Sequence, residues 1–335
     1  MKRFLLLFIL CHTPMSLFAQ DSLNFPTIGE VKRLDPRIDR LIPRNAVIEV
    51  VSEGFTWSEG PAWDKENGVL LFSDVHENRI IRWKEGEGKS VWMEPSGYTG
   101  ATARTGGRGS NGLMFDHEGN LLLCEHGDRR VSMLTKAGGK RTLVDNYMGK
   151  RLNSPNDLCV ASNGDIYFTD PAYGLPQGWD DPYKELDFCG VYLLRKSGEL
   201  VLLINNLYAP NGVCLSPDEK TLYVATRNED WLGFMSYPVK EDGTLGLGKK
   251  FYDASKDAEK QEGGPDGMRV DTQGNLWATG PGGVYVFSPA GEVLGKIETG
   301  ERIANCAFGD DGSVLYLTSD MYLCRIQTSV KGVGF

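Results

Sequence analysis

The stretch Asp165-Ile-Tyr-Phe-Thr-Asp170 follows the turn Ser162-Asn-Gly164, and this combination of turn and strand recurs along the chain. Each copy has a turn rich in Gly, Asp or Asn, followed by a strand rich in Leu, Tyr and Val. The six copies of the strand are residues 69–74, 120–125, 165–170, 221–226, 275–280 and 314–319. Six repeats of one strand unit indicate a repeat architecture, in which each unit completes its core against its neighbours.

Further strands flank each copy and complete the unit. Third strands are predicted at residues 79–84, 130–135, 190–195, 233–239, 283–288 and 321–327. Fourth strands are predicted at residues 90–93, 141–144, 200–204, 250–252 and 292–297. The sixth unit lacks a fourth strand, whereas an unassigned strand at residues 46–52 precedes the first unit. An all-β, six-bladed β-propeller closed by this N-terminal strand explains both features and leaves only short edges.

Composition and charge further restrict the class of protein. The 335 residues are 41% hydrophobic, which is enough for a packed core. The formal net charge is −9, and Lys and Arg form no basic run, so nucleic acid is not an expected partner. We expect the propeller to occupy residues 46–330, after an extended arm at residues 20–45 that contains Pro26, Pro36 and Pro43.

Residues 1–19 have the pattern of an export signal. Lys2 and Arg3 precede a short apolar run that ends at Leu10, and Ala19 supplies a small residue for cleavage. The apolar run is too short to span a bilayer, and no later segment approaches that length. We therefore predict an exported protein, periplasmic in a Gram-negative bacterium, whose mature chain does not insert into the membrane. Its six remaining cysteines are expected to be buried thiols.

A polar residue opens the innermost strand of each predicted blade, at a spacing of one blade. These six residues, here called the anchors, are Glu59, Asn111, Asn156, Asn211, Asp266 and Asn305. Asn-Gly and Asp-Gly pairs are usually turns, but here the hairpin turns lie further along each unit. All six anchors should therefore surround one end of the central channel, where their carboxylates would repel one another unless a cation were present.

The anchors offer oxygen ligands and no histidine, a set that favours a hard divalent cation. Ca²⁺ is the first expectation, Mg²⁺ and Mn²⁺ follow, and Zn²⁺ ranks below them. The expected ligands are Glu59, Asn156, Asn211 and Asp266. Asn111 and Asn305 are expected to orient the ring or to contact a ligand.

Several longer motifs together resemble bacterial gluconolactonases, which are grouped with regucalcin and the luciferin-regenerating enzymes. The motifs are Ser58-Glu-Gly-Pro-Ala-Trp63, Cys124-Glu-His-Gly-Asp-Arg-Arg130, Leu152-Asn-Ser-Pro-Asn-Asp157, Phe168-Thr-Asp-Pro-Ala-Tyr-Gly174, Pro210-Asn-Gly212 and Pro265-Asp-Gly-Met268. The resemblance covers about residues 33–327 and implies a six-bladed propeller with one axial metal that hydrolyses sugar lactones. It also implies metal-ligand roles for Glu59, Asn156, Asn211 and Asp266, with Asp266 as the general base.

The expected reaction is the opening of D-glucono-1,5-lactone or a related aldonolactone to the aldonic acid. Asp157, beside a predicted ligand, is expected either to orient water or substrate or to form a hydrogen-bonded blade corner. Asn111, Asn156, His126 and Tyr173 are the candidate substrate contacts, although His126 also fits a structural histidine. Tyr173 and Trp179 belong to the long insertion at residues 171–189, which is expected to cover the pocket. Arg129 and Arg130 are expected to be solvated or paired with blade acids.

Two other functions are compatible with the same fold. One keeps the metal site and changes the substrate to another cyclic ester or a sugar-derived ligand. The other is a non-catalytic propeller that binds a carbohydrate or a protein, with a purely structural metal. Motifs for a serine-hydrolase elbow or a phosphate loop are missing from the sequence.

Overall fold

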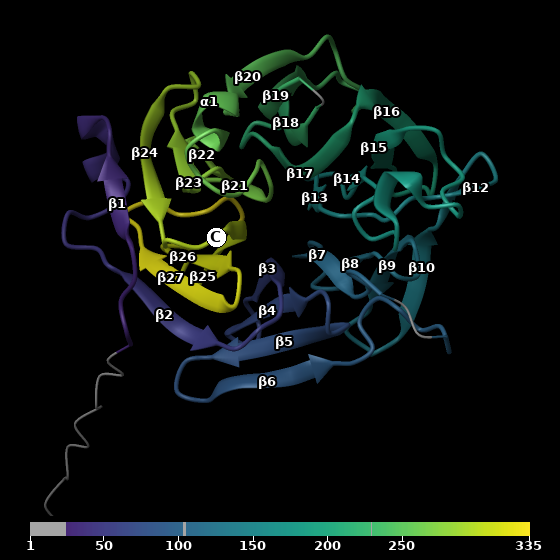
Figure 1. Cartoon of the computed structure of the whole chain (residues 1–335), viewed down its shortest axis with the longest axis horizontal. Coiled ribbons are helices and arrows are strands. Elements are labelled where there is room, and N and C mark those ends of the chain that lie inside the picture. The colour runs from purple at the N-terminus through teal and green to yellow at the C-terminus, as the bar shows by residue number, and fades with distance from the viewer. Residues whose placement is uncertain (1–24, 103–104, 229) are drawn as a thin grey trace, which may run out of the picture.

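A computed structural model describes residues 25–335 except 103–104 and 229, and in it the chain forms a six-bladed β-propeller (Figure 1). The predicted export signal at residues 1–19 lies outside the described residues. Every blade contains an antiparallel sheet of four strands; these follow one another in the chain in blades 1 to 5, the outer strand of blade 6 comes from the N-terminal part of the chain, and blade 5 carries a fifth strand at its outer edge.

The strands of the first three blades begin and end close to their predicted positions. Blade 1 contains β3 (Ser58–Asp64), β4 (Val69–Asp74), β5 (Arg79–Lys84) and β6 (Gly88–Met93). Blade 2 contains β7 (Ser110–Phe115), β8 (Leu121–Glu125), β9 (Arg130–Leu134) and β10 (Lys140–Val144). Blade 3 contains β13 (Leu158–Val160), β14 (Ile166–Asp170), β15 (Cys189–Leu194) and β16 (Leu200–Leu207). A small hairpin, β11 (Asn146–Tyr147) and β12 (Lys150–Arg151), connects blades 2 and 3.

The second half of the ring repeats this arrangement. Blade 4 contains β17 (Ala209–Leu215), β18 (Thr221–Arg227), β19 (Leu232–Pro238) and β20 (Lys249–Asp253). Blade 5 contains β21 (Met268–Val270), β22 (Leu276–Gly280), β23 (Gly283–Phe287) and β24 (Val293–Glu298). Blade 6 contains β25 (Ile303–Gly309), β26 (Val314–Ser319), β27 (Tyr322–Gln327) and β2 (Ile48–Glu53). The helical segments are short: η1 (Pro36–Arg40), η2 (Gly178–Asp180) and α1 (Ser255–Ala258).

The N-terminal strand closes the ring as predicted. Strand β2 pairs antiparallel with β27, and Ile48 lies opposite Ile326. Figure 1 shows this closure as the purple start of the chain beside its yellow end. The first and last parts of the sequence thus form one blade.

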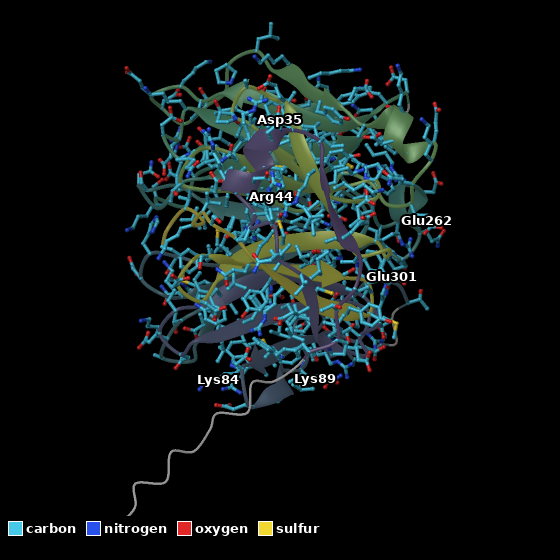
Figure 2. The ribbon with its side chains drawn as sticks, turned by 90° about the vertical axis from the view of Figure 1, so that its left-hand side faces the viewer. Asp35, Arg44, Lys84, Lys89, Glu262 and Glu301 are labelled. Carbon is cyan, nitrogen blue, oxygen red and sulfur yellow. The ribbon has the colours of Figure 1, made fainter. Side chains whose placement is uncertain are left out.

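The described part of the arm packs on the outside of the propeller. Strand β1 (Glu30–Arg33) pairs antiparallel with β24, so that Glu30 lies opposite Glu298. The η1 turn that follows buries Ile38, and Asp35 and Arg44 of the same arm are labelled in the side view of Figure 2. Because β1 covers an outer edge, the arm protects blade 5 from pairing with other chains.

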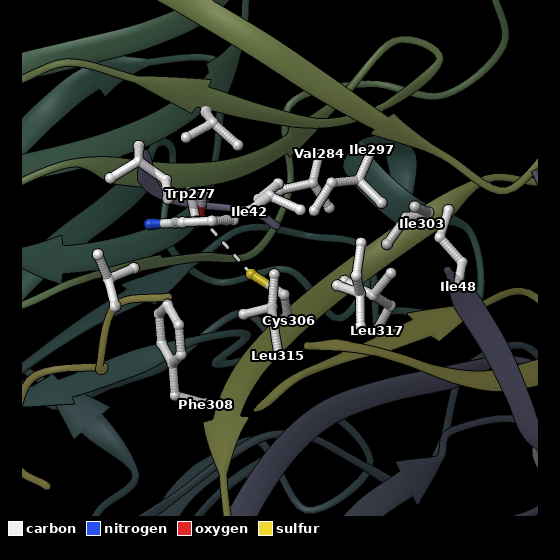
Figure 3. Packing of buried hydrophobic residues seen from close by; sticks show 14 of the residues in the cluster. Ile42, Ile48, Trp277, Val284, Ile297, Ile303, Cys306, Phe308, Leu315 and Leu317 are labelled. Carbon is white, nitrogen blue, oxygen red and sulfur yellow. Dashed lines mark hydrogen bonds between the residues drawn. The ribbon is translucent and has the colours of Figure 1, made fainter. Parts of the chain in front are cut away.

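Apolar side chains fill the spaces between adjacent blades. Between blades 5 and 6, Trp277 packs with Ile42 and Cys306, and the Cys306 thiol donates to the Trp277 carbonyl at 3.6 Å (Figure 3). The six cysteines of the described chain are all free and buried, which confirms the prediction of packed thiols. None of the helices in the described chain is long and apolar enough to cross a bilayer.

The glycine that follows an anchor is required by close packing between blades. A Cβ atom on Gly60 would lie 1.9 Å from the Asn111 carbonyl oxygen of the next blade. A Cβ atom on Gly212 would lie 2.2 Å from the Asp266 carbonyl oxygen. Neighbouring inner strands therefore approach so closely that only glycine fits, and these Asn-Gly and Glu-Gly pairs are not hairpin turns.

Candidate functional site

The six anchors lie on the innermost strands, which contact one another in sequence around the ring. Glu59, Asn111, Asn211 and Asn305 lie within β3, β7, β17 and β25, while Asn156 and Asp266 lie two residues before β13 and β21. Glu262 and Glu301 each stand four residues before an anchor, and Figure 2 places both at the same end of the molecule.

Hydroxyl groups on the second strands fix the anchor backbones of the following blades. The Ser73 hydroxyl donates to the Asn111 carbonyl at 2.8 Å, and the Thr169 hydroxyl donates to the Asn211 carbonyl at 2.6 Å. In blade 5 the Thr279 hydroxyl donates to the Ala304 carbonyl at 2.9 Å. Each of these bonds crosses from one blade to the next, so the register of the anchors is set between blades.

Several oxygen atoms at this end of the channel are buried without a partner. Asn111 Oδ1, Asn211 Oδ1 and Asp157 Oδ2 form no hydrogen bond with any described residue. An unpaired buried acceptor costs about 1–3 kcal/mol, so such atoms point to a ligand that supplies the missing interaction. The axial oxygens therefore have free capacity for a cation or for donor groups of a substrate.

Three carboxylates converge here, and burial raises the pKa of each. Burial raises the pKa of Glu59 to about 7, and the Asp157 charge adds to the effect. Burial, followed by the charges of Glu59 and Asp157, raises the pKa of Asp266 well above its usual range. Burial also raises the pKa of Asp157, against the opposing charge of Arg269.

Arg269 supplies only part of the compensating charge. Its Nη1 lies 3.9 Å from Asp157 Oδ2, and it also donates to the Met268 carbonyl at 2.8 Å. If Glu59, Asp157 and Asp266 were all ionised, this one guanidinium would leave two negative charges unbalanced, which agrees with the raised pKa values of the three groups. A divalent cation matches that deficit in sign and size.

Asn305 orients the ring, one of the two roles expected for it. Its Nδ2 donates to Glu59 Oε2 at 3.3 Å, and its Oδ1 accepts from the Cys306 amide at 2.9 Å. The Gly60 amide also donates to Glu59 Oε2, at 2.9 Å. Asn305 is thus hydrogen-bonded on both sides of its amide, unlike Asn111 and Asn211, whose side-chain oxygens have no partner among the described residues.

The predicted substrate contact His126 lies against Gly174, the residue that follows the other predicted contact, Tyr173. His126 is buried, and a Cβ atom on Gly174 would lie 2.4 Å from the His126 Cβ atom. Tyr173 is 39% exposed and packs edge-on against Trp179, with ring centroids 5.0 Å apart. Burial, followed by the Asp266 charge, raises the pKa of the Tyr173 hydroxyl, so the insertion of blade 3 approaches the axial carboxylates. That either side chain contacts substrate stays a prediction.

A clamp that the sequence did not reveal holds the segment in front of Asn156. The Asp170 carboxylate accepts from the Asn153 and Ser154 amides, both at 2.8 Å. The Arg129 guanidinium donates to the Leu152 carbonyl at 2.7 Å and to the Asn153 carbonyl at 3.1 Å. The amide groups and the carbonyl groups of this segment are therefore both held by side chains, just before the chain reaches Asn156 and Asp157.

Arg129 is not solvated, which was one of the two alternatives expected for it, and its charge acts on the buried blade acid Asp170. Arg129 is buried and its guanidinium bonds backbone carbonyls, including that of Tyr183 at 2.9 Å. Arg130, in contrast, pairs with Glu125 at 2.8 Å, as expected. Residue type alone did not separate two adjacent arginines, because the positive φ of 58° at Arg129 turns its side chain inward.

A metal site built only from acidic side chains, His and Cys is not present. Within the described residues, no group of three or more such side chains is placed to hold a metal ion. The axial set instead combines the carboxylates of Glu59 and Asp266 with asparagine amides, and oxygen ligands of these kinds suit Ca²⁺. The predicted ligand set stays a prediction.

Comparison with known proteins defines the class. The model of the SMP-30/Gluconolactonase/LRE-like region matches residues 57–321. The chain belongs to this family.

Two similar proteins are gluconolactonases. A gluconolactonase of Zymomonas mobilis is 36% identical over 326 residues, which cover 94% of this chain and 90% of the relative. The structure of a gluconolactonase of Xanthomonas campestris has a TM-score of 0.78 and 31% identity, covering 90% of this chain and 97% of its own. A calcium-binding regucalcin of Agrobacterium tumefaciens, with a TM-score of 0.66 and 19% identity, shares the fold; 84% of this chain and 94% of its own are covered. The chain is a lactone hydrolase, as its motifs predicted.

Proposed function

We propose that this protein hydrolyses a sugar lactone, D-glucono-1,5-lactone or a related aldonolactone, at the axial end of its propeller with one divalent cation. The observation that carries the proposal is the convergence of Glu59, Asp157 and Asp266 against the single charge of Arg269. Its gluconolactonase relatives support a small sugar lactone as the substrate.

The residues at the site fit a divalent cation. Buried oxygens without a hydrogen-bond partner among the described residues occur on Asn111, Asn211 and Asp157, and the nearby carboxylates, once ionised, would exceed the charge of Arg269 by two. Glu59, Asn156, Asn211 and Asp266 would hold the ion, with Ca²⁺ first and Mg²⁺, Mn²⁺ or Zn²⁺ as alternatives. A bound divalent cation supplies a Lewis acid that polarises the lactone carbonyl.

The reaction adds water to the lactone carbonyl and breaks the ring ester bond, and it yields an aldonate and a proton. The Asp266 carboxylate is the general base that takes the proton from the attacking water, since its raised pKa makes it a stronger base than an exposed aspartate. Asp157 orients the water or a sugar hydroxyl through Oδ2, which has no hydrogen-bond partner among the described residues. Asn305 holds Glu59 in place through its amide.

The substrate would be bound by the side chains around the axial end. Asn111 and Asn156 offer amide groups to the sugar hydroxyls, and His126 and Tyr173 form the wall on blades 2 and 3. Tyr173, with the adjacent Trp179, offers an aromatic surface for the sugar ring. Export to the periplasm is part of the proposal and rests on residues 1–19 alone.

The test is lactone hydrolysis by chelated protein, followed by pH-stat with the spontaneous rate subtracted. Ca²⁺, Mg²⁺, Mn²⁺ and Zn²⁺ are then added back separately. The proposal predicts that chelation removes the activity and that at least one ion restores it. Circular dichroism of the chelated protein separates loss of the cation from loss of the fold.

Full activity after exhaustive chelation would contradict the metal dependence. A folded, cation-loaded protein with no rate above background on any aldonolactone would contradict the lactonase assignment, and a binding propeller would then be the better description.

A further inference from the structure

Blade symmetry places one residue of each blade at the rim, directly after its second strand. In blade 2 this residue is His126, which follows β8, and in blade 4 it is Arg227, the last residue of β18. In blade 3 the same position begins the insertion that carries Tyr173. His126 and Arg227 therefore occupy equivalent positions in blades 2 and 4, and the insertion that carries Tyr173 begins at the equivalent position of blade 3 between them.

Contacts place Arg227 beside the segment that leads into Asp266. A Cβ atom on Gly264 would lie 2.8 Å from Arg227 Nη2 and 3.7 Å from its Cζ. Gly264 stands two residues before Asp266, so the guanidinium covers the backbone that presents this carboxylate. After burial, the charges of Asp266 and Arg227 act on the pKa of the Tyr173 hydroxyl in opposite directions, which agrees with Arg227 and Asp266 both lying near it.

The guanidinium of Arg227 is available for a ligand. Arg227 is exposed, and it forms no ion pair or side-chain hydrogen bond with any residue that the structure describes. Acidic side chains are abundant in this chain, and other arginines use them: Arg325 pairs with both Glu49 and Glu85. What distinguishes Arg227 from other exposed arginines without an ion pair, such as Arg141, is its position beside the segment that leads into Asp266.

We propose that Arg227 is a specificity-determining residue that binds a carboxylate on the lactone substrate, at the end remote from the reacting carbonyl. The preferred substrate class is then a lactone of a sugar diacid, an aldarolactone, and this inference rests on the proposed lactonase function. Two parallel N–H groups of one guanidinium match the two oxygens of a carboxylate.

The charge of the site makes such a residue necessary. Glu262 and Glu301 lie at the same end of the molecule and would repel an anionic substrate even with Arg269 and a divalent cation balancing the axial carboxylates (Figure 2). A neutral aldonolactone needs no cationic group at the rim. An aldarolactone does, because its second carboxylate would otherwise approach an uncompensated negative surface.

The experiment compares D-glucaro-1,4-lactone with D-glucono-1,4-lactone, which differ only in a carboxylate or a hydroxymethyl group at C6. In both, water adds to C1 and the C1–O4 bond breaks, which releases a proton that pH-stat detects. The ratio of kcat/KM for the diacid lactone to that for the neutral lactone is measured in wild type, Arg227→Lys and Arg227→Gln. The control is Arg141→Gln, which removes one exposed charge from β10 in blade 2.

The expected wild-type ratio favours the diacid lactone by about tenfold or more, the scale of one charge-assisted pair. Arg227→Gln should bring the ratio down about tenfold, mainly through KM, and Arg227→Lys should retain part of it. Arg141→Gln should leave the ratio unchanged. A wild-type ratio near one, or a ratio that Arg227→Gln does not change, overturns the inference and leaves the lactonase function standing.

Equilibrium binding separates this inference from the proposed function. Calorimetry of D-glucarate and D-gluconate with the cation-supplemented protein needs no turnover. If neither lactone is hydrolysed, tighter binding of D-glucarate that Arg227→Gln abolishes still supports the anion site. Equal affinity for the two acids would then overturn it.

Discussion

Asp266 and Asp271 are five residues apart in blade 5, and their surroundings show how this propeller separates function from folding. The Asp271 carboxylate accepts from the Gln273 and Asn275 amides, each at 2.9 Å, from Asn275 Nδ2 at 2.8 Å and from Trp277 Nε1 at 3.1 Å. It is fully committed to the turn that precedes β22. Asp266 instead faces other carboxylates, whose charges add to burial in raising its pKa.

Other turn aspartates and other axial residues show the same difference in hydrogen bonding. The same turn aspartate recurs at Asp64 and Asp116, and each holds its own hairpin with two amide donors and an asparagine side chain. At the axial end, Asn111 and Asn211 instead leave buried oxygens without partners in the described structure. Polar groups that serve the fold are paired within their blade, and polar groups that serve a ligand are left with free capacity.

The largest effect is expected for Asp266→Asn. Loss of the general base should lower kcat by about 10²–10⁴-fold, while the free energy of unfolding should hold or rise because one buried charge is removed. Steady-state kinetics and denaturant unfolding on the same preparation measure both quantities. Wild-type kcat in this variant would show that Asp266 is not the base.

The opposite pattern is expected for Asp271→Asn. The new amide group faces two donors, Asn275 Nδ2 and Trp277 Nε1, so the free energy of unfolding should fall by about 2–3 kcal/mol. Below the unfolding transition, kcat/KM should stay close to that of wild type. A variant that unfolds normally but loses activity would break the separation between the two regions.

Asp170 tests the comparison through the pH dependence of stability, because this buried carboxyl group serves the fold by accepting from the Asn153 and Ser154 amides. Burial raises its pKa to about 7 against an unfolded value of 3.8. Between these two pH values the folded state binds a proton that the unfolded state has released, so the stability contributed by Asp170 decreases as pH rises and is constant above pH 7. The stability of Asp170→Asn relative to wild type should therefore increase by roughly 4 kcal/mol from pH 4 to pH 8.

Denaturant unfolding of both proteins at four or five pH values measures this difference. A relative stability that is flat over the range, or that moves the other way, would show that Asp170 is ionised in the fold at low pH.

The smallest effect is expected for Asp128→Asn, in the motif Cys124-Glu-His-Gly-Asp-Arg-Arg130. Asp128 accepts from the Thr99 amide at 3.0 Å and hydroxyl at 2.8 Å, both on an exposed segment. The side chain of an asparagine can still accept from the Thr99 amide through Oδ1 and donate to the Thr99 hydroxyl through Nδ2. The free energy of unfolding should therefore change by less than about 1 kcal/mol. Thermal unfolding and kcat both check this, and a large loss of activity would assign the segment a role in the site.

Much of the fold could be predicted because each blade repeats the same local signals. The strand at residues 165–170 and its copies define the blades, and the unassigned strand at residues 46–52 requires closure with the last blade. The pairing of β1 with β24 could not be predicted, because Glu-Val-Lys-Arg carries no strong strand pattern and its partner lies more than 260 residues away.

The repeat also predicted the part of the candidate site that recurs in every blade, but not the residues that occur in one blade only. The anchors share one position in every blade, so their convergence follows from symmetry. Arg129, Asp170 and Arg269 act through contacts between loops or across the channel, which no repeat encodes. Their side chains are of types common on surfaces, and only the folded chain shows that they hold the backbone or balance the axial charge.

The most direct test is the stoichiometry of divalent cation binding to the chelated protein, measured by calorimetry with Ca²⁺ and Mn²⁺. The account predicts one ion per chain in wild type and in Asp271→Asn, and loss of that site in Glu59→Gln and Asp266→Asn. Absence of binding in folded wild type, or unchanged binding in both axial variants, would contradict the claim that the axial ring is a cation site.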